Sequence, residues 1–192
     1  MAYKYKNVLN LQAPDKVIRE ILSSIQHTEH GLGSIDFNTI TPMPPWVLAG
    51  SESAKESWCK ENWGAPENAS GLAQSVASYD GGDTIEFDTL GSDVRELMRK
   101  LSMMFPQAGL VVDYLWASED VGADVGAVQF IDGEQVYEYI PEAGSSAAFE
   151  MAFDVFATNA KAHGLVFDDT LGTYRYEGSL LTQGEGRDGQ EE

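Results

Sequence analysis

The sequence predicts a single α+β domain built as a two-layer sandwich, in which a mostly antiparallel sheet carries its helices on one face. Strand-like and helix-like segments interleave along the 192 residues. Several strand segments alternate apolar and polar side chains, as antiparallel strands with one solvated face do. Asp132-Gly133, between two alternating segments, is typical of a two-residue hairpin turn. At 43% hydrophobic residues, the chain has enough apolar material for a core.

The first 66 residues are expected to hold two strands and two helices. Residues 6–13 have the pattern of a half-buried strand, and Asp15 is a candidate N-cap for the helix that follows. That helix has an apolar stripe at helical spacing, made of Val17, Ile18, Ile21, Leu22 and Ile25. Residues 34–40 are read as a second strand. Three prolines at 42, 44 and 45 exclude regular structure, and a short helix follows over residues 53–62.

The rest of the chain continues the alternation of strands and helices. Ser92 is the candidate N-cap of the most clearly amphipathic helix. The expected elements are a loop or weak helix at 67–82, a strand at 84–89, a helix at 93–104, a strand at 110–116, a hairpin at 126–139, a helix at 145–160 and a short hairpin within 164–181. Residues 1–182 are therefore predicted to form one domain, and residues 183–192 a disordered acidic tail.

Cysteine content and hydropathy indicate the compartment. Cys59 is the only cysteine, so no disulfide can form within the chain. No long apolar run follows Met1, which excludes a signal peptide, and no segment approaches the length of a membrane span. We expect a protein of the host-cell cytoplasm that does not contact membranes.

The charge balance is the most informative bulk property. The chain has 31 acidic and 12 basic residues, a formal net charge of −19. Such a surface repels nucleic acid and anionic lipid and attracts basic proteins, although acidity can also serve only solubility. Residues 1–100 contain 9 basic and 14 acidic residues, whereas residues 101–192 contain 3 and 17. No Lys or Arg occurs between residues 101 and 160, where ten acids lie.

These acids give the candidate partner-binding residues. We expect the hairpin and its flanks to present a row of carboxylates on one surface. The candidates are Asp113, Glu119, Asp120, Asp124, Asp132, Glu134 and Glu138.

Catalytic and metal-binding motifs are missing. The ligands that zinc prefers amount to His27, His30, His163 and Cys59, and a structural zinc site normally needs four Cys or His ligands close together. The chain contains no Gly-x-Ser-x-Gly, and no phosphate-binding glycine loop precedes a helix. We therefore assign no catalytic residue, no metal and no cofactor.

Three tryptophans define a second candidate surface. Trp46, Trp58 and Trp63 cluster around the proline-rich loop and the helix after it. Tryptophan is enriched at interfaces, which makes them a candidate aromatic interface. Large aromatic residues also dominate protein cores, and this second interpretation is the one that residue preference favours.

Three sequence blocks resemble the YubB-like family of phage and conjugative-plasmid proteins. The blocks are Phe37-Asn38-Thr39-Ile40-Thr41-Pro42-Met43-Pro44, Glu61-Asn62-Trp63-Gly64 and Ile85-Glu86-Phe87-Asp88-Thr89. The resemblance implies a ferredoxin-like fold and an accessory protein of a mobile element, and it brings no catalytic residue. The chain departs from the family at 65–67, where a Lys-Trp pair is usual, and at 90–92, where an aromatic residue and two prolines are usual.

Charge and resemblance together lead to three hypotheses. The first is a non-enzymatic binding protein that mimics nucleic acid and blocks a nuclease, a restriction enzyme or a CRISPR complex, as an anti-defence inhibitor. The second is an enzyme or small-ligand-binding protein with a pocket lined by the three tryptophans. The third is a structural accessory protein whose acidity is incidental.

Overall fold

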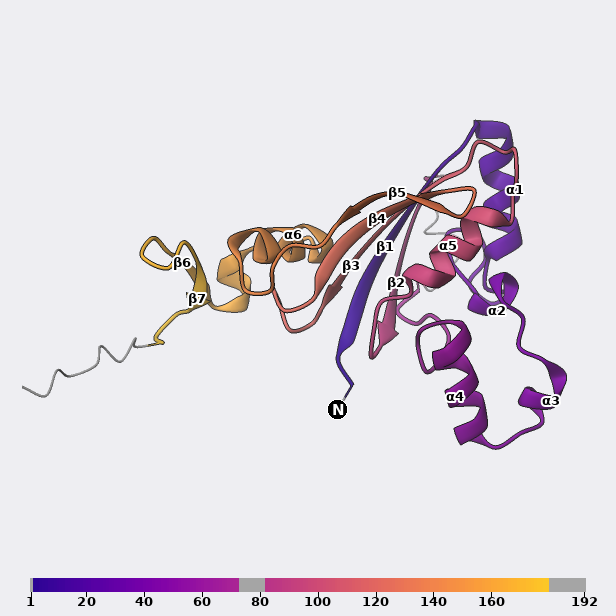
Figure 1. Ribbon diagram of the computed structural model, residues 1–192, viewed down its shortest axis with the longest axis horizontal. Coiled ribbons are helices and arrows are strands. Elements are labelled where there is room, and N and C mark those ends of the chain that lie inside the picture. The colour runs from indigo at the N-terminus through magenta and orange to yellow at the C-terminus, as the bar shows by residue number, and fades with distance from the viewer. Residues whose placement is uncertain (1, 73–81, 180–192) are drawn as a thin grey trace, which may run out of the picture.

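The computed structural model describes residues 2–72 and 82–179 (Figure 1). Its centre is a five-stranded antiparallel sheet with the strand order β2-β1-β3-β4-β5. The strands are β1 (Lys4–Gln12), β2 (Thr84–Leu90), β3 (Val111–Ser118), β4 (Val125–Ile131) and β5 (Glu134–Tyr139). The predicted α+β class with a mostly antiparallel sheet is thus confirmed.

One face of the sheet is covered by helices from the first half of the chain and by α5 (Figure 1). These helices are α1 (Asp15–Ile25), α2 (Phe37–Ile40), α4 (Glu52–Asn62) and α5 (Arg95–Met103), and a further short helix, α3 (Pro45–Leu48), precedes α4. Alternation along β1 turns Leu9 and Leu11 toward this layer, and the register places Tyr114 beside Leu9. The main core lies between these two layers.

A buried polar network crosses this core. Asn7 on β1 is fully buried and donates to the carbonyl of Phe87 and the hydroxyl of Thr89. The Tyr114 hydroxyl donates to Asn7 Oδ1 at 2.6 Å and accepts from the backbone N–H of Val94 at 2.9 Å. The network therefore ties β1, β2 and β3 to the start of α5.

The helix α6 (Ser146–Phe156) lies on the opposite face of the sheet (Figure 1), so the expectation that the helices cover one face does not hold for α6. Ala148 and Ala152 pack there against Ala117 of β3 and Val125 of β4 and form a second, smaller cluster. Their short side chains let the helix approach the strands closely. Beyond α6 come a 3₁₀ helix (Ala160–His163) and a separate two-stranded hairpin, β6 (Leu165–Asp168) and β7 (Thr173–Tyr176), which confirms the hairpin expected within 164–181.

Several local expectations are wrong in instructive ways. Residues 34–40 do not form a strand, because the Asp36 side chain accepts from the backbone N–H of Asn38 and starts the short helix α2. Asp15 is the first residue of α1, after Pro14, and does not cap it. Ser92 does not cap α5, since its hydroxyl donates to the carbonyl of Gly64.

Other expectations concern the ends of elements. The 145–160 helix stops at Phe156 because Ala157 adopts a left-handed conformation. The prolines do not exclude regular structure throughout 41–45, because Pro45 begins α3 and a proline fits the first helical turn. Most of the expected 67–82 segment and the whole 183–192 tail lie outside the described residues.

Candidate functional site

The loop between β3 and β4 carries three of the candidate carboxylates at one end of the sheet. Asp124 is half-buried and accepts from the Tyr5 hydroxyl at 2.8 Å and from the Trp116 indole N–H at 3.1 Å. Burial and this hydrogen bond raise the pKa of Tyr5 well above its ordinary value. Glu119 is exposed and accepts from the backbone N–H of Lys4 at 2.9 Å. Asp124 is therefore mainly structural, whereas Glu119 and Asp120 face solvent.

Asp120 borders a shallow pocket of about 360 Å³ between this loop, α6 and β7. Its other lining residues are mostly apolar or small, namely Val121, Gly122, Ala123, Ala143, Gly144, Phe149 and Tyr176. Apolar walls with one carboxylate at the rim suit the long stem and cationic head of a lysine or arginine side chain.

The remaining candidates do not join this group. Asp132 and Glu134 lie at the β4–β5 turn, at the far end of the strands. The pairs Ala117–Val125 and Val111–Ile131 are six residues apart along β3, which corresponds to about 20 Å.

Asp113 and Glu138 lie on opposite faces of the sheet. Asp113 accepts hydrogen bonds from Gln12 and Gln129 on the face that carries α6. Glu138 lies 3.7 Å from Arg95 on the face that carries α5. The expected single row of carboxylates is thus wrong, and the structure divides the candidates between two ends and two faces.

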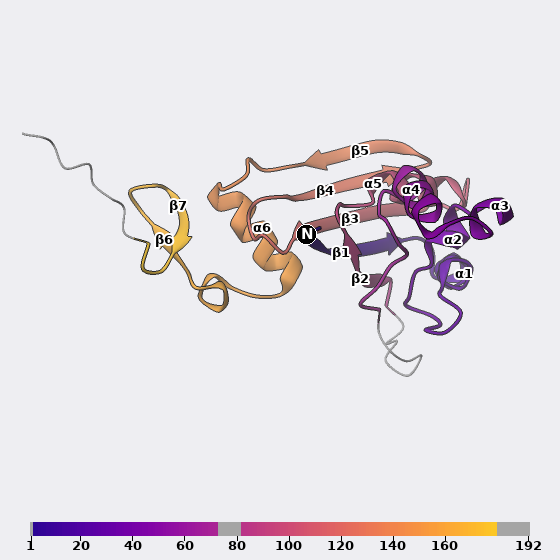
Figure 2. The same ribbon diagram turned by 90° about the horizontal axis from the view of Figure 1, so that it is seen from below.

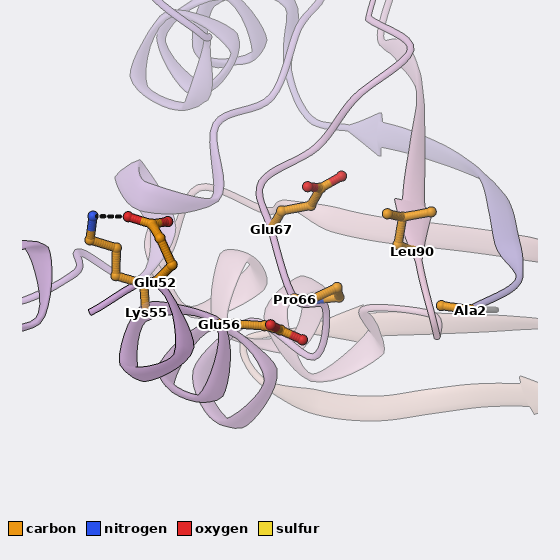
Figure 3. Close-up of a pocket in the computed structure, with 7 residues that line it drawn as sticks. All are labelled: Ala2, Glu52, Lys55, Glu56, Pro66, Glu67 and Leu90. Carbon is orange, nitrogen blue, oxygen red and sulfur yellow. Dashed lines mark hydrogen bonds and ion pairs between the residues drawn. The ribbon is translucent and has the colours of Figure 1, made fainter. Parts of the chain in front are cut away.

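A second pocket, of about 430 Å³, lies between α4 and the end of β2 and is acidic (Figure 3). Its carboxylates are Glu52, Glu56 and Glu67, and its other lining residues are Ala2, Lys55, Pro66 and Leu90. Lys55 pairs with Glu52 at 2.7 Å and Lys60 with Glu56 at 2.6 Å. Sequence reasoning missed this pocket, although the spacing of Glu52 and Glu56 places both on one helix face.

The three tryptophans do not share a surface. Trp63 is buried, donates to the Thr41 carbonyl at 2.8 Å and meets the edge of the Trp58 ring at a centroid distance of 5.5 Å. Trp46 on α3 is 73% exposed. Trp63 therefore belongs to the core, Trp58 is half-buried against it, and Trp46 is the most exposed of the three.

The described residues contain no assembled metal site. In 2–72 and 82–179, no three or more His, Cys, Asp or Glu side chains are grouped so as to hold a metal ion. His27 and His30 have ring centroids 5.0 Å apart, whereas His163 stacks on Phe153. Cys59 is buried, and burial raises the pKa of its thiol, which reduces its reactivity. None of the helices in these ranges is long and apolar enough to cross a bilayer.

The sheet, its covering helices and the exposed carboxylates define an acidic ferredoxin-like domain. Residues 57–159, more than half of the chain, match the family described as the ferredoxin-like domain in Api92-like protein, and the chain belongs to that family. This confirms the ferredoxin-like fold that the sequence blocks imply. Neither the curated proteins nor the solved structures contain a match to the chain.

Proposed function

We propose that this chain is a non-enzymatic binding protein that uses its carboxylates to occupy a basic, nucleic-acid-binding surface of another protein. The observation that carries the proposal is the charge of −19 on a folded domain. The eight ion pairs of the described residues use Lys4, Lys6, Lys55, Lys60, Arg95, Arg99 and Arg175. Few cations are left to neutralise the remaining carboxylates.

The distribution of the exposed carboxylates supports mimicry of nucleic acid. Glu119 and Asp120 at one end of the sheet and Asp132 and Glu134 at the other are separated by about 20 Å along the strands. Duplex DNA carries one charge per about 1.7 Å of axis. A groove that binds duplex DNA therefore presents cations along its length, and these cations could pair with carboxylates at both ends of the sheet. Opposite charge would speed association, and salt would weaken it.

The YubB-like resemblance supports a more specific form of the proposal. A protein of a phage or plasmid meets nucleases, restriction enzymes and CRISPR complexes, all of which hold nucleic acid in basic channels. We place this chain among the anti-defence inhibitors that block such a channel, acting in the host-cell cytoplasm. The alternative of a tryptophan-lined pocket has less support, because Trp63 is buried and Trp46 is exposed.

The proposal is tested by capture at graded salt. The immobilised chain is exposed to extract from bacteria with restriction and CRISPR systems, and bound proteins are identified by mass spectrometry. We expect a nucleic-acid-binding protein to be retained at low salt, released at high salt and displaced by added DNA. Retention that DNA does not displace would contradict mimicry.

Two matched variants locate the surface. One reverses three exposed candidates, Glu119→Lys, Asp120→Lys and Glu134→Lys, and leaves in place Asp113 and Asp124, which accept hydrogen bonds from other side chains. The control reverses three exposed acids of the first half, Asp15→Lys, Glu20→Lys and Glu29→Lys, with the same change in net charge. We expect binding to fall at least tenfold only in the first variant. An equal loss in both would mean that net charge alone is recognised.

A further inference from the structure

The edge strand β5 exposes its whole length. All six of its residues are exposed, and Tyr137 and Val136 are 53% and 51% exposed. Ile140, directly after the strand, is also exposed. Strand β2, at the other edge of the sheet, is partly covered, because Ser70 and Asp88 exchange backbone hydrogen bonds of 3.0 and 2.8 Å. The open edge of the described sheet is therefore β5 (Figure 2).

Edge strands are usually protected from further pairing by lysine, proline, short length or a bulge. β5 contains neither lysine nor proline. Its register against β4 shifts between Gln129 and Phe130, so Val136 is left outside the pairing. The bulge affects only this point, and residues 137–140 continue to Pro141 with aromatic and aliphatic side chains exposed.

The charges beside this edge favour a cationic occupant. Asp132 lies just before β5, Glu134 is its first residue, and Glu142 follows it. Among the described residues, Arg95 forms an ion pair with β5, and it is shared between Glu138 at 3.7 Å and Asp93 at 2.9 Å. A second copy of this chain would bring the same carboxylates and another charge of −19 to the edge. Self-pairing is therefore disfavoured.

We propose that β5 binds an extended segment of a basic protein, which adds to the sheet as a sixth strand. The inference rests on the proposed function for the basic character of the partner. Main-chain hydrogen bonds to the open edge would supply affinity, and side chains on alternate positions would supply selectivity. The bound segment would bury the exposed apolar side chains of the edge.

The two faces of β5 define the pattern of the segment. Tyr137 and Tyr139 pair with Gln129 and Ala127 and lie on the same face as α6, whereas Glu138 faces α5. Lysine or arginine on one side of the segment would lie beside Glu138, and an apolar side chain on the other would lie beside the tyrosine rings. The segment should therefore alternate cationic and apolar residues.

The test uses the full chain labelled with ¹⁵N and a synthetic peptide, acetyl-Lys-Val-Lys-Val-Lys-Val-Lys-amide. We expect the largest NMR shift changes at the amides of residues 134–140 and slower hydrogen exchange in the same amides. The control peptide has the same sequence with every backbone amide N-methylated, which keeps its charge and leaves neither edge with N–H donors for strand pairing. We expect it to bind at least tenfold more weakly.

A variant pair separates strand addition from attraction by charge. Val136→Lys with Ile140→Lys places cations on the edge, whereas Glu150→Gln with Asp154→Asn makes the same change in net charge on α6. The first pair should lose peptide binding and the second should keep it.

The peptide experiments would overturn the inference by showing no binding, equal binding of the N-methylated peptide or shifts centred away from β5. A dimer in sedimentation experiments that Val136→Lys with Ile140→Lys abolishes would also overturn it. If a nucleic-acid-binding protein is captured equally well by the edge variant, the proposed function stands and strand addition is refuted.

Discussion

Replacing Tyr114 with phenylalanine should destabilise the protein by about 2–4 kcal/mol, because the hydroxyl has two buried partners. Without it, Asn7 Oδ1 loses a donor at 2.6 Å and the Val94 N–H loses an acceptor at 2.9 Å. Each buried group left without a hydrogen-bond partner costs about 1–3 kcal/mol of stability. Part of this loss is offset because the folded protein no longer has to desolvate the tyrosine hydroxyl. The ring itself stays in the core, so no large cavity is left.

The measurement is urea unfolding followed by tryptophan fluorescence, to which the buried Trp116 contributes; its ring centroid lies 5.5 Å from that of Tyr114. The control is Tyr137→Phe, which removes a hydroxyl on the exposed strand β5 and should change stability by less than about 0.5 kcal/mol. If both variants lose the same amount, the buried network does not support the start of α5 in the way we infer.

Three further perturbations test other contacts. Gly126→Ala would place a Cβ atom 2.3 Å from the buried ring of Trp116, and we expect a cost of about 1–3 kcal/mol in urea unfolding. Trp63→Ala should cost about 3–5 kcal/mol, whereas Trp46→Ala, at an exposed site, should cost less than about 0.5 kcal/mol. Because the folded-state pKa of Tyr5 lies above its ordinary value of 10.0, its contribution is complete below that pH and falls as pH rises further. Tyr5→Phe should therefore lose less stability between pH 8 and pH 11 than the unchanged protein, and an equal loss would contradict this assignment.

Local signals in the sequence are sufficient to predict those elements whose conformation is determined by neighbouring residues. The Asp132-Gly133 turn has positive φ at both positions, which the residue types favour, and the predicted hairpin follows from it. The 34–40 prediction failed because Ile35 and Phe37 are both buried, two residues apart, as in a strand. Asp36 between them instead caps a short helix, and periodicity over so few residues does not distinguish the two.

Properties that depend on strand order could not be predicted. The candidate carboxylates were expected in one row because they are close in sequence, but successive strands run in opposite directions and alternate between faces. The position of α6 on the second face depends on Ala148 and Ala152 meeting Ala117 and Val125 of neighbouring strands. The Glu67 wall of the acidic pocket likewise comes from a loop that only the tertiary fold brings to α4.

The position of β1 inside the sheet, between β2 and β3, has a consequence for folding during synthesis. Lys4–Gln12 leaves the ribosome before both of its partner strands, β2 and β3, which end at Leu90 and Ser118. Its apolar side chains stay without their strand partners while about a hundred further residues are translated, at about 5–20 residues per second. The nascent chain thus carries an unpaired strand segment for several seconds, and a fragment limited to the family-matched residues 57–159 would lack the strand that joins β2 to β3.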